Sequence, residues 1–314
     1  MSKSSTERSI RELIYWACAT EVRAFKPGNV SVMSPGYGMT ANTFFEAASA
    51  ICAPMGAAGI SVGHRILRSV QASKQAVHCN ANLGIILLCA PLSHAALSCE
   101  RAGQFRTTLN RTLLELNVDD AVAAYRAICL ASPSGLGVAP REDVRSRPNV
   151  TLLEAMRLSA GRDRIAYQYA HFYEDIFELG VPTFVEAFSV SQSAESAAVA
   201  VFFAMLSHFP DSHISRKYGD AVAEDVCARA REICSNVGST FGRSPVDRLW
   251  AFDRYLKSNS LNPGTSADLT VATLVAACCV DNHDPLRPLF KNRFMKPAPG
   301  FSLPWASGLD DGSA

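Results

Sequence analysis

The chain of 314 residues has little charge and almost no net charge: 19% of its residues are charged and the formal charge is +1. Nucleic-acid binding depends on clustered Lys and Arg that displace counterions from phosphates, so this balance argues against a nucleic-acid partner. The longest apolar runs, 83–92 and 269–280, are shorter than the ~20 residues of a membrane-spanning helix. The first residues also lack the apolar segment of a signal peptide. We therefore expect a soluble, cytoplasmic protein without a membrane partner.

The ten cysteines form no CxxC pair, and most of them lie within apolar helical patterns. This distribution supports neither a zinc site nor a disulfide framework, and it is typical of reduced cysteines that act as small core residues. Hydrophobic residues make up 48% of the chain, which is the composition of a globular protein with a large core.

Alternating strand patterns bounded by hairpin turns are also missing, whereas helical periodicity recurs along the whole chain. We predict an all-α fold: a single multi-helix domain over residues 1–295, with a cleft at its helix junctions. Residues 296–314, rich in Pro, Gly and Ser, would form a C-terminal tail. The expected helices are 5–23, 40–51, 62–77, 83–90, 104–116, 119–131, 151–179, 193–209, 220–236, 245–256 and 265–280.

A polar turn, EVRAFKPGNVS, follows the first expected helix and begins at Glu21. The apolar spacing of that helix places Glu21 at the end of its core-facing stripe, where a carboxylate needs a partner. Pro27 and Gly28 allow the backbone to expose N–H groups beside Lys26, as an anion site requires. Alternatively, the turn is a simple connector on which Lys26 and Asn29 are solvated.

A second carboxylate, Asp163, lies in the middle of the apolar stripe of the expected helix 151–179. It would either form a structural ion pair or belong to a site. Its neighbours Arg162 and Arg164 point to other faces of a continuous helix, so an arginine partner would come from elsewhere in the chain.

Polar residues also gather at two further helix junctions. Asn80 and Asn82 precede an apolar helix, where they would either cap the helix or help to bind an anion. The loop 210–219 combines Asp211 with Arg216 and Lys217, which suits a phosphate site and equally an ordinary charged loop.

The last apolar helix opens with Thr265 and Asp268, at the spacing of a capping box. Asp268 would therefore either cap this helix or face a ligand. Carboxylates able to hold Mg²⁺, together with Lys and Arg able to bind phosphates, favour a nucleoside triphosphate as ligand. The sequence has no GxxxxGK[ST] pattern, so such a ligand would bind in a helical cleft.

Six segments, in order along the chain, carry a family resemblance: KPGNV from Lys26, NANLG from Asn80, the helix 119–130 leading to GLG at 135–137, RDRIA from Arg162, RKYG from Arg216 and NPGTSADL from Asn262. Together they resemble the triphosphoribosyl-dephospho-coenzyme A synthase family over roughly residues 10–280. The resemblance implies an all-α transferase that uses ATP and Mg²⁺. In this family the 2′-hydroxyl of 3′-dephospho-coenzyme A attacks the ribose C1′ of ATP, adenine leaves, and the triphosphate stays on the transferred ribose.

The resemblance implies roles for eleven residues. Those assigned to the nucleotide and its phosphates are Lys26, Asn29, Asn80, Asn82, Arg216, Lys217 and Thr265. The catalytic residues and magnesium ligands would be Glu21, Asp211 and Asp268, with Asp163 orienting the groups around them. A carboxylate near an anomeric carbon can stabilise an oxocarbenium-like state or take the proton of the attacking hydroxyl.

The second motif departs from the family. The citrate-lyase branch has Asn-Thr-His-Lys-Gly where this chain has Asn80-Ala-Asn-Leu-Gly84. The same transfer to another cofactor precursor, such as a pterin or a one-carbon carrier, therefore stays open. So do an Mg²⁺-dependent N-glycosyl hydrolase, in which water replaces the alcohol, and a non-catalytic nucleotide-binding protein. The expected partners are ATP and a small-molecule acceptor, and a homodimer is compatible with the sequence.

Overall fold

A computed structural model of the chain describes residues 3–99, 103–133, 135–138, 141–235 and 245–281. The predicted tail 296–314 and the predicted boundary at residue 295 lie outside the described residues. Within them, extended backbone is limited to two isolated bridges, Ser31–Ser34 and Gly36–Met39, so the all-α prediction is confirmed. The helices are α1 (Lys3–Arg23), α2 (Ala41–Gly56), α3 (Val62–Val77), α4 (Leu83–Ser98), α5 (Phe105–Leu114), α6 (Val118–Ala131), α7 (Leu152–Ser159), α8 (Arg164–Ala170), the π-helical turn η1 (Ile176–Gly180), α9 (Val181–Ser191), α10 (Ala194–His208), α11 (Ser212–Tyr218), α12 (Asp220–Ser235), α13 (Pro245–Ser258) and α14 (Gly264–Asp281).

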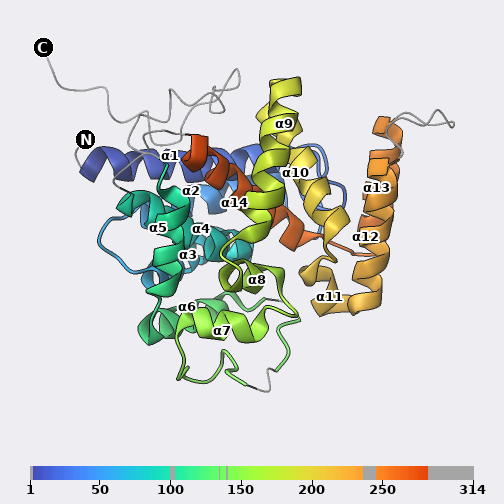
Figure 1. The fold of residues 1–314 in the computed structure, drawn as a ribbon. Coiled ribbons are helices and arrows are strands. Elements are labelled where there is room, and N and C mark those ends of the chain that lie inside the picture. Colours follow the sequence, from blue (N-terminus) through green and yellow to red (C-terminus); the bar gives the residue numbers. More distant parts are fainter. Residues whose placement is uncertain (1–2, 100–102, 134, 139–140, 236–244, 282–314) are drawn as a thin grey trace, which may run out of the picture.

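Helix α14 runs through the middle of the molecule (Figure 1). It packs against α1, α4, α9, α10 and α11, which explains why its sequence is apolar on every face. The main core gathers around α14, α1 and α4, and α2, α3 and α6 extend it as a succession of packed neighbours. A second buried cluster joins α10 to α11, α12 and α13, and it contains Phe202, Ile214 and Leu256.

The predicted helix 151–179 is wrong as a single element. The structure breaks it after Ser159, restarts it at α8, and breaks it again where Phe172 and Tyr173 have positive φ angles of 53° and 61°. Asp163 does not lie inside a helix; its Oδ1 accepts hydrogen bonds from the backbone N–H groups of Ile165 and Ala166 and so caps α8.

Two tyrosine contacts with α4 accompany this break. Pro91 has no N–H to donate to the carbonyl of Leu87, one turn earlier in α4. The hydroxyl of Tyr169 donates to that carbonyl at 2.6 Å, and the hydroxyl of Tyr173 donates to the carbonyl of Leu88 at 2.8 Å. These two tertiary contacts attach the interrupted segment to α4.

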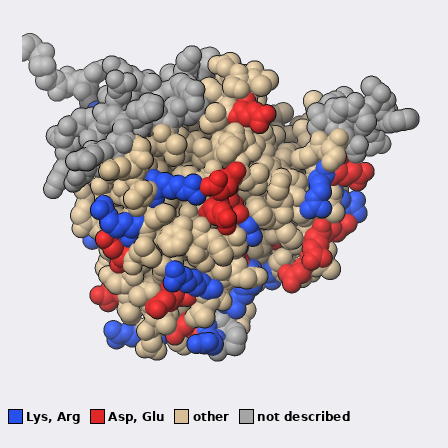
Figure 2. Space-filling view, viewed as in Figure 1, with Lys and Arg blue, Asp and Glu red and all other residues tan. Residues whose placement is uncertain are grey.

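Charges of both signs are interspersed over the face shown in Figure 2, in keeping with the net charge of +1. Among the described helices, none combines the length and the apolar character that a bilayer crossing requires.

Candidate active site

The helices α4, α8, α11 and α14 begin around a common cavity of about 1010 Å³, together with the turn that follows α1. Helix N-termini carry partial positive charge, so this arrangement favours anionic ligands. Nine of the eleven predicted site residues line the cavity: Glu21, Asn29, Asn80, Asn82, Asp163, Arg216, Lys217, Thr265 and Asp268. The structure brings these nine together, and it places Lys26 and Asp211 outside the cavity lining.

Lys26 is completely buried inside the turn after α1. Its Nζ lies 3.1 Å from Oε1 of Glu21 and donates to the backbone carbonyls of Glu21 and Ala24 at 2.5 and 3.1 Å. Burial raises the pKa of Glu21 and lowers that of Lys26, and the ion pair opposes both shifts. Lys26 thus neutralises Glu21 and ties the turn together. The geometry disagrees with the prediction that Lys26 contacts phosphate.

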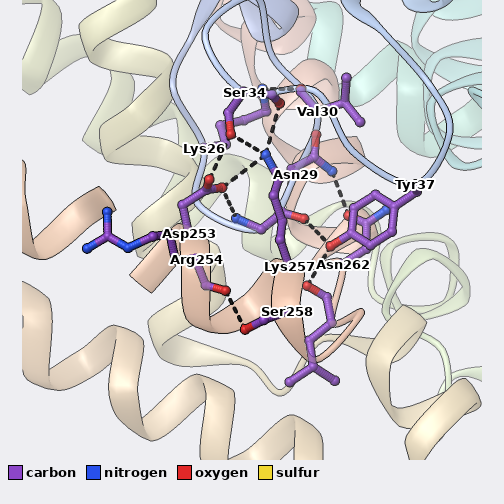
Figure 3. A network of polar contacts seen from close by, with 12 residues as sticks. Lys26, Asn29, Val30, Ser34, Tyr37, Asp253, Arg254, Lys257, Ser258 and Asn262 are labelled. Carbon is purple, nitrogen blue, oxygen red and sulfur yellow. Dashed lines mark hydrogen bonds and ion pairs between the residues drawn. The ribbon is translucent and has the colours of Figure 1, made fainter. Parts of the chain in front are cut away.

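A carboxylate on α13 holds the next part of the turn (Figure 3). Asp253 accepts hydrogen bonds from the N–H of Gly28 at 2.8 Å and from the hydroxyl of Ser34 at 2.7 Å, and it lies 3.2 Å from Nζ of Lys257. Gly28 has φ of 77°, and a Cβ there would clash with Leu256, so only glycine fits. No motif in the sequence singles out Asp253.

The amide of Asn29 continues this network towards α14. Its Nδ2 donates to Oδ1 of Asn262 at 2.9 Å, and both residues line the cavity. The hydroxyl of Tyr37 lies 2.7 and 2.9 Å from the carbonyls of Gly28 and Leu261. The turn is therefore fixed to the segment before α14 (Figure 3), which positions Glu21 and Asn29 at the cavity wall.

Asp211 joins the starts of α11 and α14. Its Oδ1 accepts from the N–H groups of His213 and Ile214, and its Oδ2 accepts from both the N–H and the hydroxyl of Ser266 at 2.8 Å. Thr265 contributes to the same junction, because its hydroxyl lies 3.2 Å from the N–H of His213. With both carboxylate oxygens engaged by protein donors, Asp211 is a poor candidate for a metal ligand or a base.

Asp268 is the carboxylate that faces the cavity at the start of α14. A Cβ on Gly84 would lie 1.9 Å from its Oδ2, so glycine at the start of α4 makes room for this side chain. Among the described residues, Asp268 has no hydrogen-bond or ion-pair partner, and the predicted capping box with Thr265 does not form. Burial, reinforced by the negative charges of Glu21 and Asp211, raises the pKa of Asp268 well above its usual range.

Three cations also line the cavity. Arg216 and Lys217 belong to the last turn of α11, and Arg162 precedes α8. Nη1 of Arg216 lies 3.4 Å from Oδ2 of Asp163, so the arginine partner of Asp163 comes from another helix, as the sequence predicted. Planar guanidinium groups next to a lysine suit the oxygens of a polyphosphate.

The imidazole of His213 also lines the cavity, one turn before Arg216 and Lys217. A Cβ on Gly264 would lie 2.4 Å from its Nδ1, so glycine allows the ring to pack against the start of α14. Burial and the two neighbouring cations lower the pKa of His213 to about 4. The ring is therefore neutral at neutral pH.

The two asparagines before α4 behave differently. Oδ1 of Asn80 accepts from the N–H of Leu83 at 3.3 Å, which is a capping contact. Oδ1 of Asn82 accepts from the hydroxyl of Ser73 at 2.7 Å, and its buried Nδ2 has no partner in the described part of the chain. The capping alternative holds for Asn80, whereas Asn82 makes no capping bond.

The described residues contain no cluster of three or more His, Cys, Asp or Glu side chains able to hold a metal ion by themselves. Mg²⁺ bound to a nucleotide needs only one or two protein carboxylates, because phosphate oxygens and water complete its octahedron. Glu21 and Asp268 both line the cavity, and the negative charge of Glu21 contributes to the raised pKa of Asp268, so this pair of carboxylates fits such an ion.

Sequence reasoning missed Asp253, Tyr37, His213 and Arg162 as contributors to the site. Asp253 lies within the predicted helix 245–256 and Tyr37 in the connector before α2, where neither pattern singles them out; their tertiary contacts with the turn reveal them. His213 and Arg162 lie within segments that the sequence did single out, beside residues that were chosen.

Comparison with known proteins relates this chain to one family. A family model described as ATP:dephospho-CoA triphosphoribosyl transferase matches residues 7–285. A solved protein of Archaeoglobus fulgidus, provisionally named triphosphoribosyl-dephospho-CoA synthase, is similar in fold, with a TM-score of 0.59 and 20% identity over 76% of this chain and 98% of that one. No curated protein matches the sequence.

Proposed function

The chain belongs to the ATP:dephospho-CoA triphosphoribosyl transferase family, and we propose that the cavity between α4, α8, α11 and α14 is where it carries out the transfer. Enzymes of this family move the triphosphoribosyl group of ATP to dephospho-CoA. The observation that carries the proposal is the set of side chains that line this one cavity: two carboxylates, Glu21 and Asp268, together with the cations Arg162, Arg216 and Lys217.

The cations would hold the triphosphate, which is carried along with the ribose and never cleaved. Arg216 and Lys217 lie next to each other at the end of α11, and Arg162 joins them from the segment before α8. Because no P–O bond breaks, these side chains need to bind and orient the phosphates only. Their main contribution is to fix the ribose C1′ relative to the carboxylates.

Glu21 and Asp268 would act at the ribose C1′, where the bond to adenine breaks and the bond to the acceptor forms. Displacement of adenine from C1′ develops positive charge on the ribose, which an ionised carboxylate stabilises. The ion pair with Lys26 at 3.1 Å favours the charged form of Glu21 against the effect of burial, so we assign this role to Glu21. Asp268 has no hydrogen-bond or ion-pair partner among the described residues and a raised pKa, which suits a group that takes the proton of the attacking hydroxyl.

Mg²⁺ fits the same pair of carboxylates, which would hold it together with phosphate oxygens and supply positive charge against the triphosphate. Lys26 and Asp211 then act as positioning residues: the first holds Glu21, and the second fixes the starts of α11 and α14. The amides of Asn29 and Asn262, already bonded to each other, would contact the ribose or its phosphates.

The test is to incubate the pure protein with Mg-ATP and dephospho-CoA and to measure adenine and the mass of the acceptor product. We expect one adenine per product molecule that carries the triphosphoribosyl group. Release of adenine with free ribose triphosphate would indicate a hydrolase instead. Product formation only with a pterin or another alcohol would keep the transfer and change the acceptor, as the NANLG motif leaves open.

A further inference from the structure

A second part of the cavity has a different character from the reaction centre. It is walled by Tyr125 and Ile128 of α6, Leu152 and Met156 of α7, and Leu136 and Val144 of the connecting segments, and we call these six residues the α6–α7 chamber. Helices α6 and α7 pack on each other, and Sγ of Cys129 contacts the carbonyl of Val144 at 3.2 Å, so these walls are contiguous. The chamber is apolar and lacks a lining cation of its own among the described residues.

The chamber adjoins the phosphate-binding wall. Gly135, beside Leu136, packs on the backbone of Arg216, where an added Cβ would lie 2.8 Å from the carbonyl oxygen. A group in the chamber is thus a neighbour of the cations proposed to hold the triphosphate. A nucleotide has this composition: an anionic end and, beyond the sugar, a flat, uncharged base that buries well between apolar side chains.

Two carboxylates of the connecting segment, Glu142 and Asp143, line the cavity beside the chamber, and Glu142 is the one with an unengaged oxygen. Its backbone has φ of 50°, unusual for a residue other than glycine, and the hydroxyl of Tyr125 donates to its carbonyl at 3.0 Å. Its Oε2 receives only a 3.3 Å hydrogen bond from the N–H of Asn149, and its Oε1 has no hydrogen-bond partner among the described residues. The neighbouring Asp143, by contrast, is paired with Arg145.

We propose that the α6–α7 chamber binds an adenine base and that Glu142 selects it by accepting a hydrogen bond from the exocyclic amine. This rests on the proposed function, since both ATP and dephospho-CoA carry adenine. A carboxylate accepts hydrogen bonds and cannot donate them, so it favours the 6-amino group of adenine and disfavours the 6-oxo group of hypoxanthine. Unpaired polar groups at such a site produce large discrimination between analogues.

The experiment compares kcat/KM for ATP with kcat/KM for ITP, and for dephospho-CoA with its deaminated, inosine-containing form. The wild-type protein should prefer the adenine form of one substrate by roughly 10- to 100-fold, the range expected for a hydrogen bond to a charged group. Whichever substrate shows the preference is the one whose base occupies the chamber.

Two variants of Glu142 and one control make the test specific. Glu142→Gly suits the positive φ, so it removes the carboxylate without straining the loop, and it should reduce the preference to less than about threefold. Glu142→Gln can accept from an amine or donate to a carbonyl oxygen, so it should also tolerate the inosine form. Asp143→Asn should retain the wild-type preference.

Calorimetric binding of free adenine and free hypoxanthine separates this inference from the proposed function, because it requires no turnover. Tighter binding of adenine that is lost in Glu142→Gly supports the chamber even if transfer is never observed. Equal binding of both bases by the wild type, or an unchanged preference in both Glu142 variants, overturns the proposal.

Discussion

Two regions around the cavity contain the same kinds of residues and use them differently. In and around the turn after α1, the polar groups of Lys26, Asp253 and Tyr37 are directed towards other protein atoms. At the start of α14 and the end of α11, Asp268 and Lys217 face the cavity and have no hydrogen-bond or ion-pair partner among the described residues. The difference teaches that a lysine or an aspartate in a motif is a stronger candidate for substrate contact when it lines the cavity and the fold leaves its charge uncompensated.

Asp268→Asn should reduce the transfer rate more than any other variant, because it removes the uncompensated carboxylate. We expect transfer to fall by about 10²–10⁴, the usual contribution of general acid–base catalysis. The raised pKa means that the folded state binds the proton of Asp268 more tightly than the unfolded state, so stability declines as pH rises above about 4.

The variant should therefore be at least as stable as the wild type at neutral pH. Adenine release and thermal unfolding at pH 5 and pH 8 measure both effects. A destabilised variant with normal turnover would place Asp268 in the scaffold instead.

Lys26→Met tests the turn after α1, where the charges are paired with one another. It leaves Glu21 as a buried, unpaired charge, and breaking such a pair typically costs about 3–5 kcal/mol. Chemical denaturation should show this loss, and Glu21→Gln in the same chain should recover part of it. If the single variant folds normally but its KM for ATP rises strongly, Lys26 contacts phosphate and the structural assignment is wrong.

Arg216→Ala should weaken ATP binding without unfolding the protein. Removing one charged phosphate contact should raise KM for ATP about 10- to 100-fold. Lys217 is exposed and unpaired in the described structure, so Lys217→Ala should raise KM less and leave the unfolding temperature unchanged. The measurement is the KM for ATP of each variant, with its unfolding curve as the control for folding. An unchanged KM in both variants would show that the triphosphate does not bind at Arg216 and Lys217.

His213→Gln should have the smallest effect, confined to acidic pH. The folded protein holds His213 neutral down to about pH 4, whereas the unfolded chain protonates it near pH 6.5, so stability falls as pH drops through this interval. The variant should lose less stability than the wild type between pH 7 and pH 4.5, by roughly 1–3 kcal/mol. Parallel pH profiles of unfolding for the two proteins would contradict the buried, neutral ring.

Helical periodicity was enough to predict the all-α fold, because an apolar stripe with a 3.6-residue period has few other interpretations. It failed over 151–179, where the hydroxyls of Tyr169 and Tyr173 bond to α4 in tertiary contacts that the local pattern does not contain. The short helix α11 was not predicted, because its capping residue Asp211 lies in a segment that has the composition of a charged loop.

The candidate site was predictable to the extent that helix ends carry recognisable polar motifs. Nine predicted residues meet at one cavity, yet the sequence could not separate Asp268 from Asp211, because burial and hydrogen bonding by Ser266 distinguish them. The role of Asp253 was not predictable either, because its partners Gly28 and Ser34 are more than 200 residues away along the chain.

The most direct measurement compares Asp211→Asn with Asp268→Asn in a single turnover of Mg-ATP and dephospho-CoA, with the product weighed by mass spectrometry. Below their unfolding temperatures, Asp211→Asn should form the triphosphoribosyl product within about tenfold of the wild-type rate despite a lower stability. Asp268→Asn should bind ATP and form almost none. Equal losses in both variants, or full activity in Asp268→Asn, would contradict the division of this site into supporting and reacting carboxylates.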